Sequence, residues 1–114
     1  MFEVTLCAAS AYERKYYLNP EFETLPESIR QELQIMCVLH TQDVGGVLQL
    51  IYNEEGRLEL RTEHSEDDFA FDEIGSALKM KELQRNKVEL FESLEMFYKV
   101  FYLGGEIEND AIDD

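Results

Sequence analysis

Two short runs of β-favouring residues, joined by a turn that ends in glycine, constrain the fold of this 114-residue chain more than any other feature. The runs are 47–52 and 57–62, and the residues between them are Asn53-Glu54-Glu55-Gly56. This pattern is typical of an antiparallel hairpin, because glycine adopts the backbone angles of a tight turn without steric cost. Alternation predicts a shared apolar face formed by Leu48, Leu50, Tyr52, Leu58 and Leu60. The opposite face of the second run is charged and is expected to be solvated.

The N-terminal residues 2–8 alternate between apolar and polar side chains, a period of two that predicts a strand. Ser10 and Glu13 then have the spacing of a capping box, in which the serine hydroxyl accepts from the amide three residues on. This spacing predicts a short helix over residues 11–18. Pro20 ends it, because the proline ring disfavours helical geometry in the preceding residue.

A longer helix is predicted from Thr24 to about residue 43. Thr24 and Glu27 repeat the capping-box spacing, and Pro26 suits a first helical turn, where no amide hydrogen bond is lost. An apolar stripe recurs every three or four residues, at Ile29, Leu33, Met36 and His40. Residues 35–39 are apolar all round, so other elements are expected to cover this part of the helix on several sides. Gly45-Gly46 then turns the chain.

Residues 74–102 have a helical pattern, either as one long helix or as two helices broken near Asn86. Steps of three and four residues mark an apolar seam with one charged interruption, at Lys87. The apolar members, called the seam residues below, are Met80, Leu83, Leu90, Leu94, Phe97 and Phe101.

The seam residues carry a prediction about assembly. An unbroken helix of this length would span about 40 Å, more than a strand of six residues covers. The uncovered part then needs a partner, and the chain is predicted to form a homodimer through the seam residues. In the alternative, the helix breaks near Asn86, both halves fold onto one core, and the protein is a monomer.

Together these elements predict an α+β fold in a single domain, residues 1–105. A small antiparallel sheet, built on the hairpin at 47–62 and joined by the N-terminal strand, packs against helices that include a long C-terminal one. Residues 106–114 are expected to form an acidic disordered tail, because they hold few apolar side chains.

The chain carries 25 acidic and 10 basic residues, for a formal charge of −15. This charge disfavours nucleic acid and anionic lipid as partners, because like charges repel at long range. No stretch approaches the roughly 18 apolar residues that span a bilayer, and residues 1–5 do not resemble the start of a signal peptide. Cys7 and Cys37 are therefore expected to be reduced, buried thiols in a cytoplasmic protein.

Cys37 and His40 lie one helical turn apart and are the candidates for chemistry. A thiolate and an imidazole at this spacing can bind one metal ion, with a third ligand from His64 or Asp43. They can also act as a nucleophile and its base, although no third group is evident to orient His40. The pattern fits a buried thiol beside a hydrogen-bonded or surface histidine better. No metal, cofactor or catalytic residue is therefore assigned.

Three charged or aromatic clusters can also be explained by structural roles. Five carboxylates within residues 66–73 lack the ligand pattern of a calcium loop, which favours a solvated loop followed by an acidic helix start. Basic residues within 79–87 fit an acidic partner or phosphate, or they balance the acids of 66–73. Tyr12 and Tyr16 fit one packed face of the predicted short helix.

Four strings carry a resemblance to a known family. They are Cys7-Ala8-Ala9-Ser10-Ala11-Tyr12 with Lys15-Tyr16-Tyr17, Glu32-Leu33-Gln34-Ile35-Met36-Cys37, Asp43-Val44-Gly45-Gly46 and Phe71-Asp72-Glu73-Ile74-Gly75-Ser76. Over residues 5–104 the chain resembles short acidic proteins of anaerobic Gram-positive gut bacteria, catalogued as a domain of unknown function. The resemblance implies a bacterial, cytosolic protein and brings no activity, cofactor or catalytic residue.

Two interpretations of function remain open. The first is a non-enzymatic protein-interaction or regulatory module, a specific form of which is an acidic decoy for a basic, nucleic-acid-binding surface on another protein. The second is a small enzyme or ligand-binding protein that uses Cys37 and His40 with acids from Asp43 or residues 66–73. The two differ in whether Cys37 and His40 face a common cavity or a sealed core.

Overall fold

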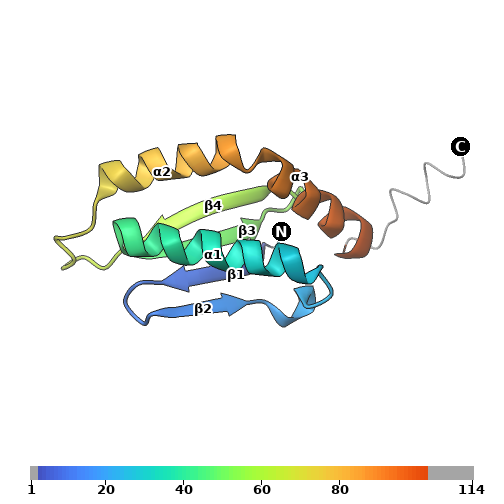
Figure 1. Cartoon of the computed structure of the whole chain (residues 1–114), viewed down its shortest axis with the longest axis horizontal. Helices are drawn as coiled ribbons and strands as arrows, with labels where there is room; N and C mark the ends of the chain where they lie inside the picture. The colour runs from blue at the N-terminus through green and yellow to red at the C-terminus, as the bar shows by residue number, and fades with distance from the viewer. Residues whose placement is uncertain (1–2, 103–114) are drawn as a thin grey trace, which may run out of the picture.

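The computed structural model describes residues 3–102. Within them the chain forms a four-stranded antiparallel sheet in the order β2-β1-β3-β4, with three α-helices (Figure 1). The strands are β1 (Val4–Ser10), β2 (Lys15–Leu18), β3 (Val47–Tyr52) and β4 (Leu58–Glu63). The helices are α1 (Glu27–Val44), α2 (Glu73–Asn86) and α3 (Val88–Phe97), and two short elements are η1 (Pro20–Phe22) and the π-helix η2 (Tyr98–Tyr102).

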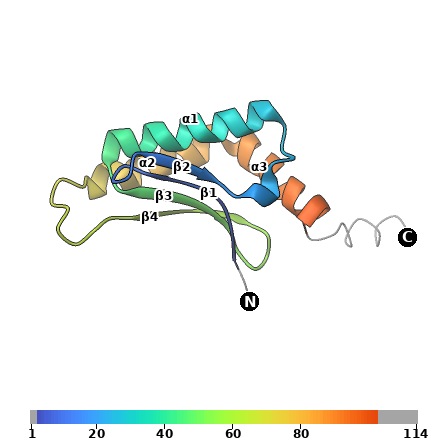
Figure 2. The same ribbon diagram turned by 90° about the horizontal axis from the view of Figure 1, so that it is seen from below.

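The three α-helices lie on the same face of the sheet, and no described helix lies on the other face (Figure 2). The predicted α+β fold with a C-terminal helix is confirmed. The expected tail at 106–114 lies outside the described residues. None of the described helices combines the length and apolar character needed to cross a membrane.

The hairpin of β3 and β4 forms as predicted. Leu50 pairs with Leu60 and Tyr52 with Leu58, so the predicted apolar side chains share the face that the helices cover. The side chain of Asn53 closes the turn, since its Oδ1 accepts from the amides of Glu55 and Arg57.

Strand β1 confirms the N-terminal prediction and takes a central place in the sheet. Its pairing with β3 shifts by one residue, because Thr5 opposes Ile51 whereas Cys7 opposes Leu50. Such a bulge lets two successive side chains turn toward the same side. Leu6 and Cys7 are accordingly both fully buried in the core.

Residues 11–18 form a turn and strand β2, so the predicted short helix is wrong. The Ser10 hydroxyl does accept from the Glu13 amide, at 3.2 Å, as the spacing requires. This hydrogen bond closes a turn. Arg14, the last residue before β2, has φ 56°, in the left-handed region of backbone conformations. Tyr16 and Tyr17 favour an extended backbone, and pairing with β1 outweighs the local helical signal.

Helix α1 is confirmed, with two corrections to its details. Its N-cap is Pro26, and that cap has no side-chain hydrogen bond, so the Thr24 capping box does not start the helix. The predicted stripe faces the core, but Ile35 and Leu39 are 59% and 53% exposed. The expectation that residues 35–39 are covered on several sides is wrong, because α1 contacts the sheet on one side and α2 along one flank (Figure 2).

The C-terminal helix is broken between Asn86 and Val88. Lys87 has φ −116° and ψ 28°, outside helical geometry, and α2 and α3 both pack within the same molecule. Leu90 and Leu94 are buried in the core of the chain itself, whereas Phe101 is 71% exposed. The break removes the unbroken helix on which the homodimer argument rested, and the homodimer itself stays a prediction.

An aromatic cluster fixes α3 and η2 over one end of the sheet. The hydroxyl of Tyr52 donates to the carbonyl of Leu94 at 2.8 Å, inside the core. The Tyr52 ring stacks on Tyr98, with centroids 4.1 Å apart, and on Phe22 at 5.6 Å. Tyr102 continues the stack from Tyr98 at 4.9 Å. The central strand and the C-terminal segment are thereby joined directly.

Replacing Tyr52 with phenylalanine tests this joint. The Tyr52→Phe variant removes one of two donors to the buried Leu94 carbonyl and leaves the other, the Tyr98 amide, so the free energy of unfolding should fall by about 0.5–1.5 kcal/mol. For a domain of this size each kcal/mol lowers the melting temperature by roughly 4 °C or more. Chemical denaturation followed by circular dichroism measures the change.

The matched control is Tyr17→Phe, which removes a hydroxyl from a half-exposed ring on the opposite sheet face. This variant should stay within about 0.5 kcal/mol of the wild type. Equal stability of the two variants would contradict a structural role for the Tyr52 hydroxyl.

Candidate functional site

The two sequence candidates for chemistry, Cys37 and His40, do not share a cavity. The Cys37 thiol lies 3.9 Å from the Cys7 thiol, and both residues are fully buried. The hydrogen bond with Cys7, and then burial, raise the pKa of Cys37 above its ordinary value. A thiol held protonated and away from solvent is a poor nucleophile and a poor metal ligand.

His40 instead faces a pocket between α1 and α2, called the His40 pocket below, with a volume of about 270 Å³. Its apolar walls come from one side of each helix: Ile35, Met36, Leu39 and Leu83. Cys37 is not part of this lining. Cys37 and His40 therefore face neither a common cavity nor a common sealed core: the thiol is enclosed in the core, whereas His40 lines the pocket with its ring nitrogens buried.

The imidazole of His40 is buried without a hydrogen-bond partner among the described residues. The residue is 4% exposed, and neither Nδ1 nor Nε2 has a partner, so the expected hydrogen-bonded or surface histidine is wrong. Burial lowers the pKa of His40 below its ordinary value, nearby Lys79 lowers it further, and Asp43 opposes the shift. At neutral pH the ring is therefore uncharged, with one N–H donor and one acceptor nitrogen. Leaving such groups unsatisfied costs about 1–3 kcal/mol.

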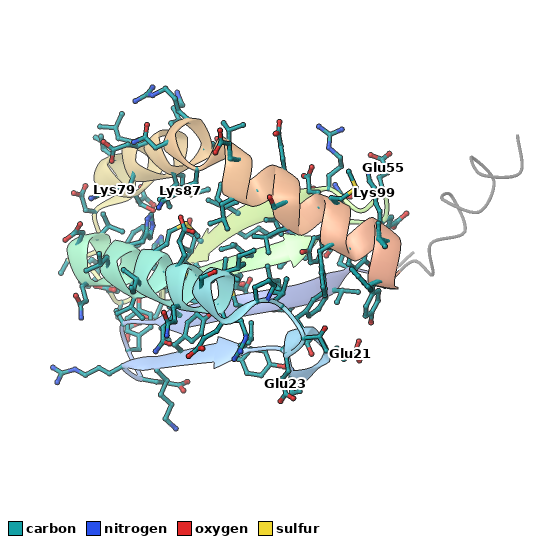
Figure 3. All side chains as sticks on the ribbon, turned by 45° about the vertical axis from the view of Figure 1, so that its right-hand side comes forward. Glu21, Glu23, Glu55, Lys79, Lys87 and Lys99 are labelled. Atoms are coloured by element: carbon teal, nitrogen blue, oxygen red, sulfur yellow. The ribbon has the colours of Figure 1, made fainter. Side chains whose placement is uncertain are left out.

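Two ion pairs cross to α1 at the edges of the pocket, one from α2 and one from Lys87 at the junction of α2 and α3. The ammonium of Lys79 lies 2.7 Å from the Asp43 carboxylate, and that of Lys87 lies 2.9 Å from Glu32. Figure 3 shows both lysines reaching from the C-terminal helices toward α1. The basic cluster thus pairs with acids of α1, not with those of residues 66–73. Its other members, Lys81 and Arg85, are exposed.

The third metal candidate, His64, lies at a separate place. Its ring stacks on Phe71 with centroids 4.4 Å apart, and its Nε2 is 3.3 Å from a Glu73 carboxylate oxygen. The acids nearby have structural roles, since Asp72 caps α2 by accepting from the Gly75 amide and Asp68 accepts from the Tyr12 hydroxyl. Over residues 3–102, no three His, Cys, Asp or Glu side chains converge in a way that could hold a metal ion.

A second hollow lies between the start of α1 and the C-terminal segment, and is called the α1–α3 groove below. It has a volume of about 670 Å³, and Glu89 and Glu92 stand on its rim. The apolar lining is Leu25, Pro26, Ile29, Met96, Phe97 and Phe101. No lysine or arginine is among its lining residues. Met96 and Phe101 are 62% and 71% exposed, so two large apolar side chains stand open to solvent here.

Sequence reasoning singled out Phe97 and Phe101 as seam residues but missed Leu25 and Met96 as their neighbours. The groove forms because the helix break directs α3 back toward the start of α1, and no local pattern encodes that direction. For the His40 pocket, the signal was present in the uninterrupted apolar run at 35–39, which places apolar side chains on the outer surface of α1.

Both thiols should react slowly in the folded protein, because neither is exposed. Titration with an aromatic disulfide reagent should label Cys7 and Cys37 quickly only after denaturant is added. A Ser28→Cys variant, with the new thiol at an exposed position of α1, serves as the fast-reacting reference. Rapid labelling of either native cysteine in buffer would revive the reactive-thiol interpretation.

The lowered pKa of His40 predicts a pH dependence of stability. As pH falls below the ordinary histidine value of about 6.5, the unfolded chain takes up a proton that the folded state resists. The free energy of unfolding of the wild type should therefore fall toward pH 5 relative to a His40→Leu variant, and the two should run parallel above about pH 7. Urea denaturation across this range measures the difference.

The control for this titration is Gln42→Leu, an exposed position on the same helix. It should keep the wild-type pH dependence. If His40→Leu keeps it as well, the imidazole is not held neutral by its surroundings.

Comparison with other proteins assigns the chain to a family. No characterised protein and no solved structure matches the chain significantly. A family model matches residues 3–106, nearly the whole chain and all of the described elements. The chain therefore belongs to DUF6145, a family of unknown function.

Proposed function

We propose that this protein is a non-enzymatic interaction module that docks a basic, amphipathic segment of a partner protein in the α1–α3 groove. The observation that carries the proposal is the pair of exposed apolar side chains, Met96 and Phe101, standing in a groove whose charged lining is entirely acidic. Large exposed apolar side chains grouped in a concave surface are typical of protein-docking sites.

The shape of the groove supports a helical segment as the occupant. Helix α3 and the first turns of α1 form its two sides, and Leu25, Ile29 and Phe97 form an apolar lining between them. An amphipathic helix can place side chains spaced three and four residues apart into such a lining. Phe101 packs against Phe97, with centroids 4.8 Å apart, and remains largely exposed in the groove.

The charge of the groove and of the whole chain supports a basic partner. Glu89 and Glu92 stand on the rim and are exposed, and the chain carries a formal charge of −15. Charge of one sign over a docking site speeds association with a partner of the opposite sign and disfavours like-charged partners. The acidic decoy is one specific form of this proposal, in which the basic partner surface is one that binds nucleic acid. A cytoplasmic, bacterial setting accords with either form.

In this geometry Cys37 is not accessible to act as the nucleophile that the enzymatic alternative requires. Cys37 is sealed against Cys7, while His40 faces a cavity that Cys37 does not line. The ligand-binding part of that alternative depends on His40 alone and is independent of the α1–α3 groove.

A synthetic helical peptide of leucine and lysine, labelled with fluorescein, tests the docking site. Removing an apolar anchor should weaken binding, so Phe101→Ser should lower the affinity by about tenfold or more in fluorescence anisotropy. Phe69→Ser is the matched control, because Phe69 is 92% exposed and lies outside the groove. Its affinity should stay within about twofold of the wild type.

A second pair of variants separates local from overall charge. Glu92→Gln removes a rim carboxylate, and Glu55→Gln makes the same change in net charge on the β3–β4 turn (Figure 3). Only Glu92→Gln should weaken peptide binding markedly at low salt. Equal effects would show that the peptide follows the overall charge rather than the groove.

The homodimer predicted from the seam residues now depends mainly on Phe97 and Phe101, because Leu90 and Leu94 are buried within one chain. Light scattering tests this alternative occupant directly. The result that would overturn the proposal of a basic partner is a mass of twice 13.3 kDa for the wild type and of 13.3 kDa for Phe101→Ser. A second copy of the chain would then occupy the groove.

A further inference from the structure

We propose that the open edge of strand β2 binds an extended segment of a partner protein as a further antiparallel strand. One apolar side chain of that segment enters a hollow between β2 and α1, called the β2–α1 hollow below, and the acidic residues that follow it lie beside Lys15 and Arg14. This surface is separate from the α1–α3 groove, and the proposal does not depend on the function proposed for that groove.

The register of the sheet leaves the backbone of two β2 residues without partners. The Asn19 amide donates to the Leu6 carbonyl at 2.9 Å, which fixes the hydrogen-bonded positions between β1 and β2. Such positions alternate along an antiparallel ladder, so Leu18 and Tyr16, one and three residues before Asn19, direct their N–H and C=O groups away from β1. Because β2 is the outermost strand and no described element lies beyond it, these groups form an open edge (Figure 1).

The opposite edge of the sheet is blocked at its start, whereas the edge of β2 is not. At the start of β4, the Leu58 amide donates to the Glu95 carboxylate at 2.8 Å. No described side chain or backbone group makes such a hydrogen bond with the backbone of Tyr16 or Leu18. Unpaired strand edges are templates for pairing with another chain. The edge of β2 therefore offers the donors and acceptors that recognition by strand addition uses.

The β2–α1 hollow has a volume of about 640 Å³ and lies beside the first half of this edge. Its lining includes Tyr16 from β2 and Gln34, Val38 and Thr41 from α1. Directly opposed residues of paired strands place their side chains on the same face of the sheet, and Tyr16 packs on the face that the helices cover. A partner residue opposite Tyr16 therefore directs its side chain into the hollow. Val38 favours an apolar side chain there.

The charges at the start of β2 define the end of the segment. Arg14 and Lys15 are exposed, and no described carboxylate lies within ion-pair distance of either. Both line the β2–α1 hollow, whose lining contains no carboxylate, and Glu13 of the same turn lines a different hollow. In an antiparallel segment, the residue after the one opposite Tyr16 comes opposite Lys15, and the next one lies beside Arg14. Opposite charges across paired strands stabilise the pairing, so these two positions favour acidic residues.

The formal charge of −15 on the whole chain opposes an acidic partner only at long range. At physiological ionic strength, exposed charges more than about 8 Å apart are largely screened. The cations next to the edge therefore outweigh distant carboxylates once the segment is in contact.

A short synthetic peptide tests the proposal. The probe is Ser-Val-Thr-Val-Glu-Asp-Ser, acetylated and amidated, in which the second valine is placed opposite Tyr16 and the glutamate opposite Lys15. It is titrated into the isotope-labelled full-length protein and followed by NMR. We expect saturable shifts of the Tyr16 and Leu18 amides, because each gains a hydrogen bond to the peptide.

Methylation of single backbone nitrogens of the peptide distinguishes strand pairing from unspecific adsorption. The N–H of the second valine points at the Tyr16 carbonyl, whereas the N–H of the threonine before it points away from β2. Methylation at this valine should weaken binding at least about tenfold, and methylation at the threonine by less than about threefold.

Two exposed lysines give a matched pair of protein variants. Lys15→Glu places a carboxylate opposite the glutamate of the peptide and should weaken binding about fivefold or more at low salt. Lys81→Glu makes the same change in net charge on α2, outside the hollow, and should stay within about twofold of the wild type.

Three outcomes would overturn the proposal. The first is an absence of saturable shifts at Tyr16 and Leu18 with peptide at millimolar concentration. The second is an equal loss of affinity for the two methylated peptides, because binding would then not use the backbone of β2. The third is a dimer by light scattering in which both amides are protected from hydrogen exchange without peptide, since a second copy of the chain would then occupy the edge.

Discussion

The contact between Tyr52 and the C-terminal segment is the interaction on which the rest of the structure depends. Tyr52 lies at the end of a central strand, and its hydroxyl and ring bind Leu94 and Tyr98, which belong to the last part of the chain. A polar group at the tip of a large apolar ring can fix both the depth and the direction of a neighbouring helix. Once α3 is fixed in this way, Phe97 and Phe101 must stand beside the start of α1. The α1–α3 groove thus depends on this buried tyrosine as well as on the helix break at Lys87.

The break at Lys87 reconciles a long helical pattern with a short sheet. Strands of six residues extend about 20 Å, and an unbroken helix over 74–102 would be about twice as long. Turning the chain at Lys87 lets α2 lie beside α1 and α3 cross toward η1 (Figure 1). Lys87 is the charged interruption of the seam, and its ammonium reaches Glu32 on α1 instead of entering the core. A charge that is unfavourable in a continuous apolar seam is well placed at a junction between two helices.

The elements that could be predicted from the sequence are those whose periodicity matches their burial. The β3–β4 hairpin and the inward stripe of α1 follow directly from alternation and from steps of three and four residues. Strand β2 could not be predicted in this way, because the Ser10–Glu13 hydrogen bond that signals a helix start also closes a β-turn, and only pairing with β1 decides between them. For the site, spacing correctly singled out His40 but paired it with Cys37. The actual surroundings of His40 come from α2, some 40 residues away in sequence.

The different surroundings of Cys37 and His40 follow from helix geometry. Side chains three residues apart diverge by about 60° around a helix axis. That angle is enough for Cys37 to face β1, where Cys7 meets it, while His40 faces α2. The ion pairs at the pocket edges are part-exposed, so water screens them and they stabilise the helix pair only weakly. These pairs alone therefore cannot hold α2 at its distance from α1. The apolar contacts of Met80 and Leu83 with the core and the turn at Lys87 also position α2, and the His40 pocket lies between α2 and α1.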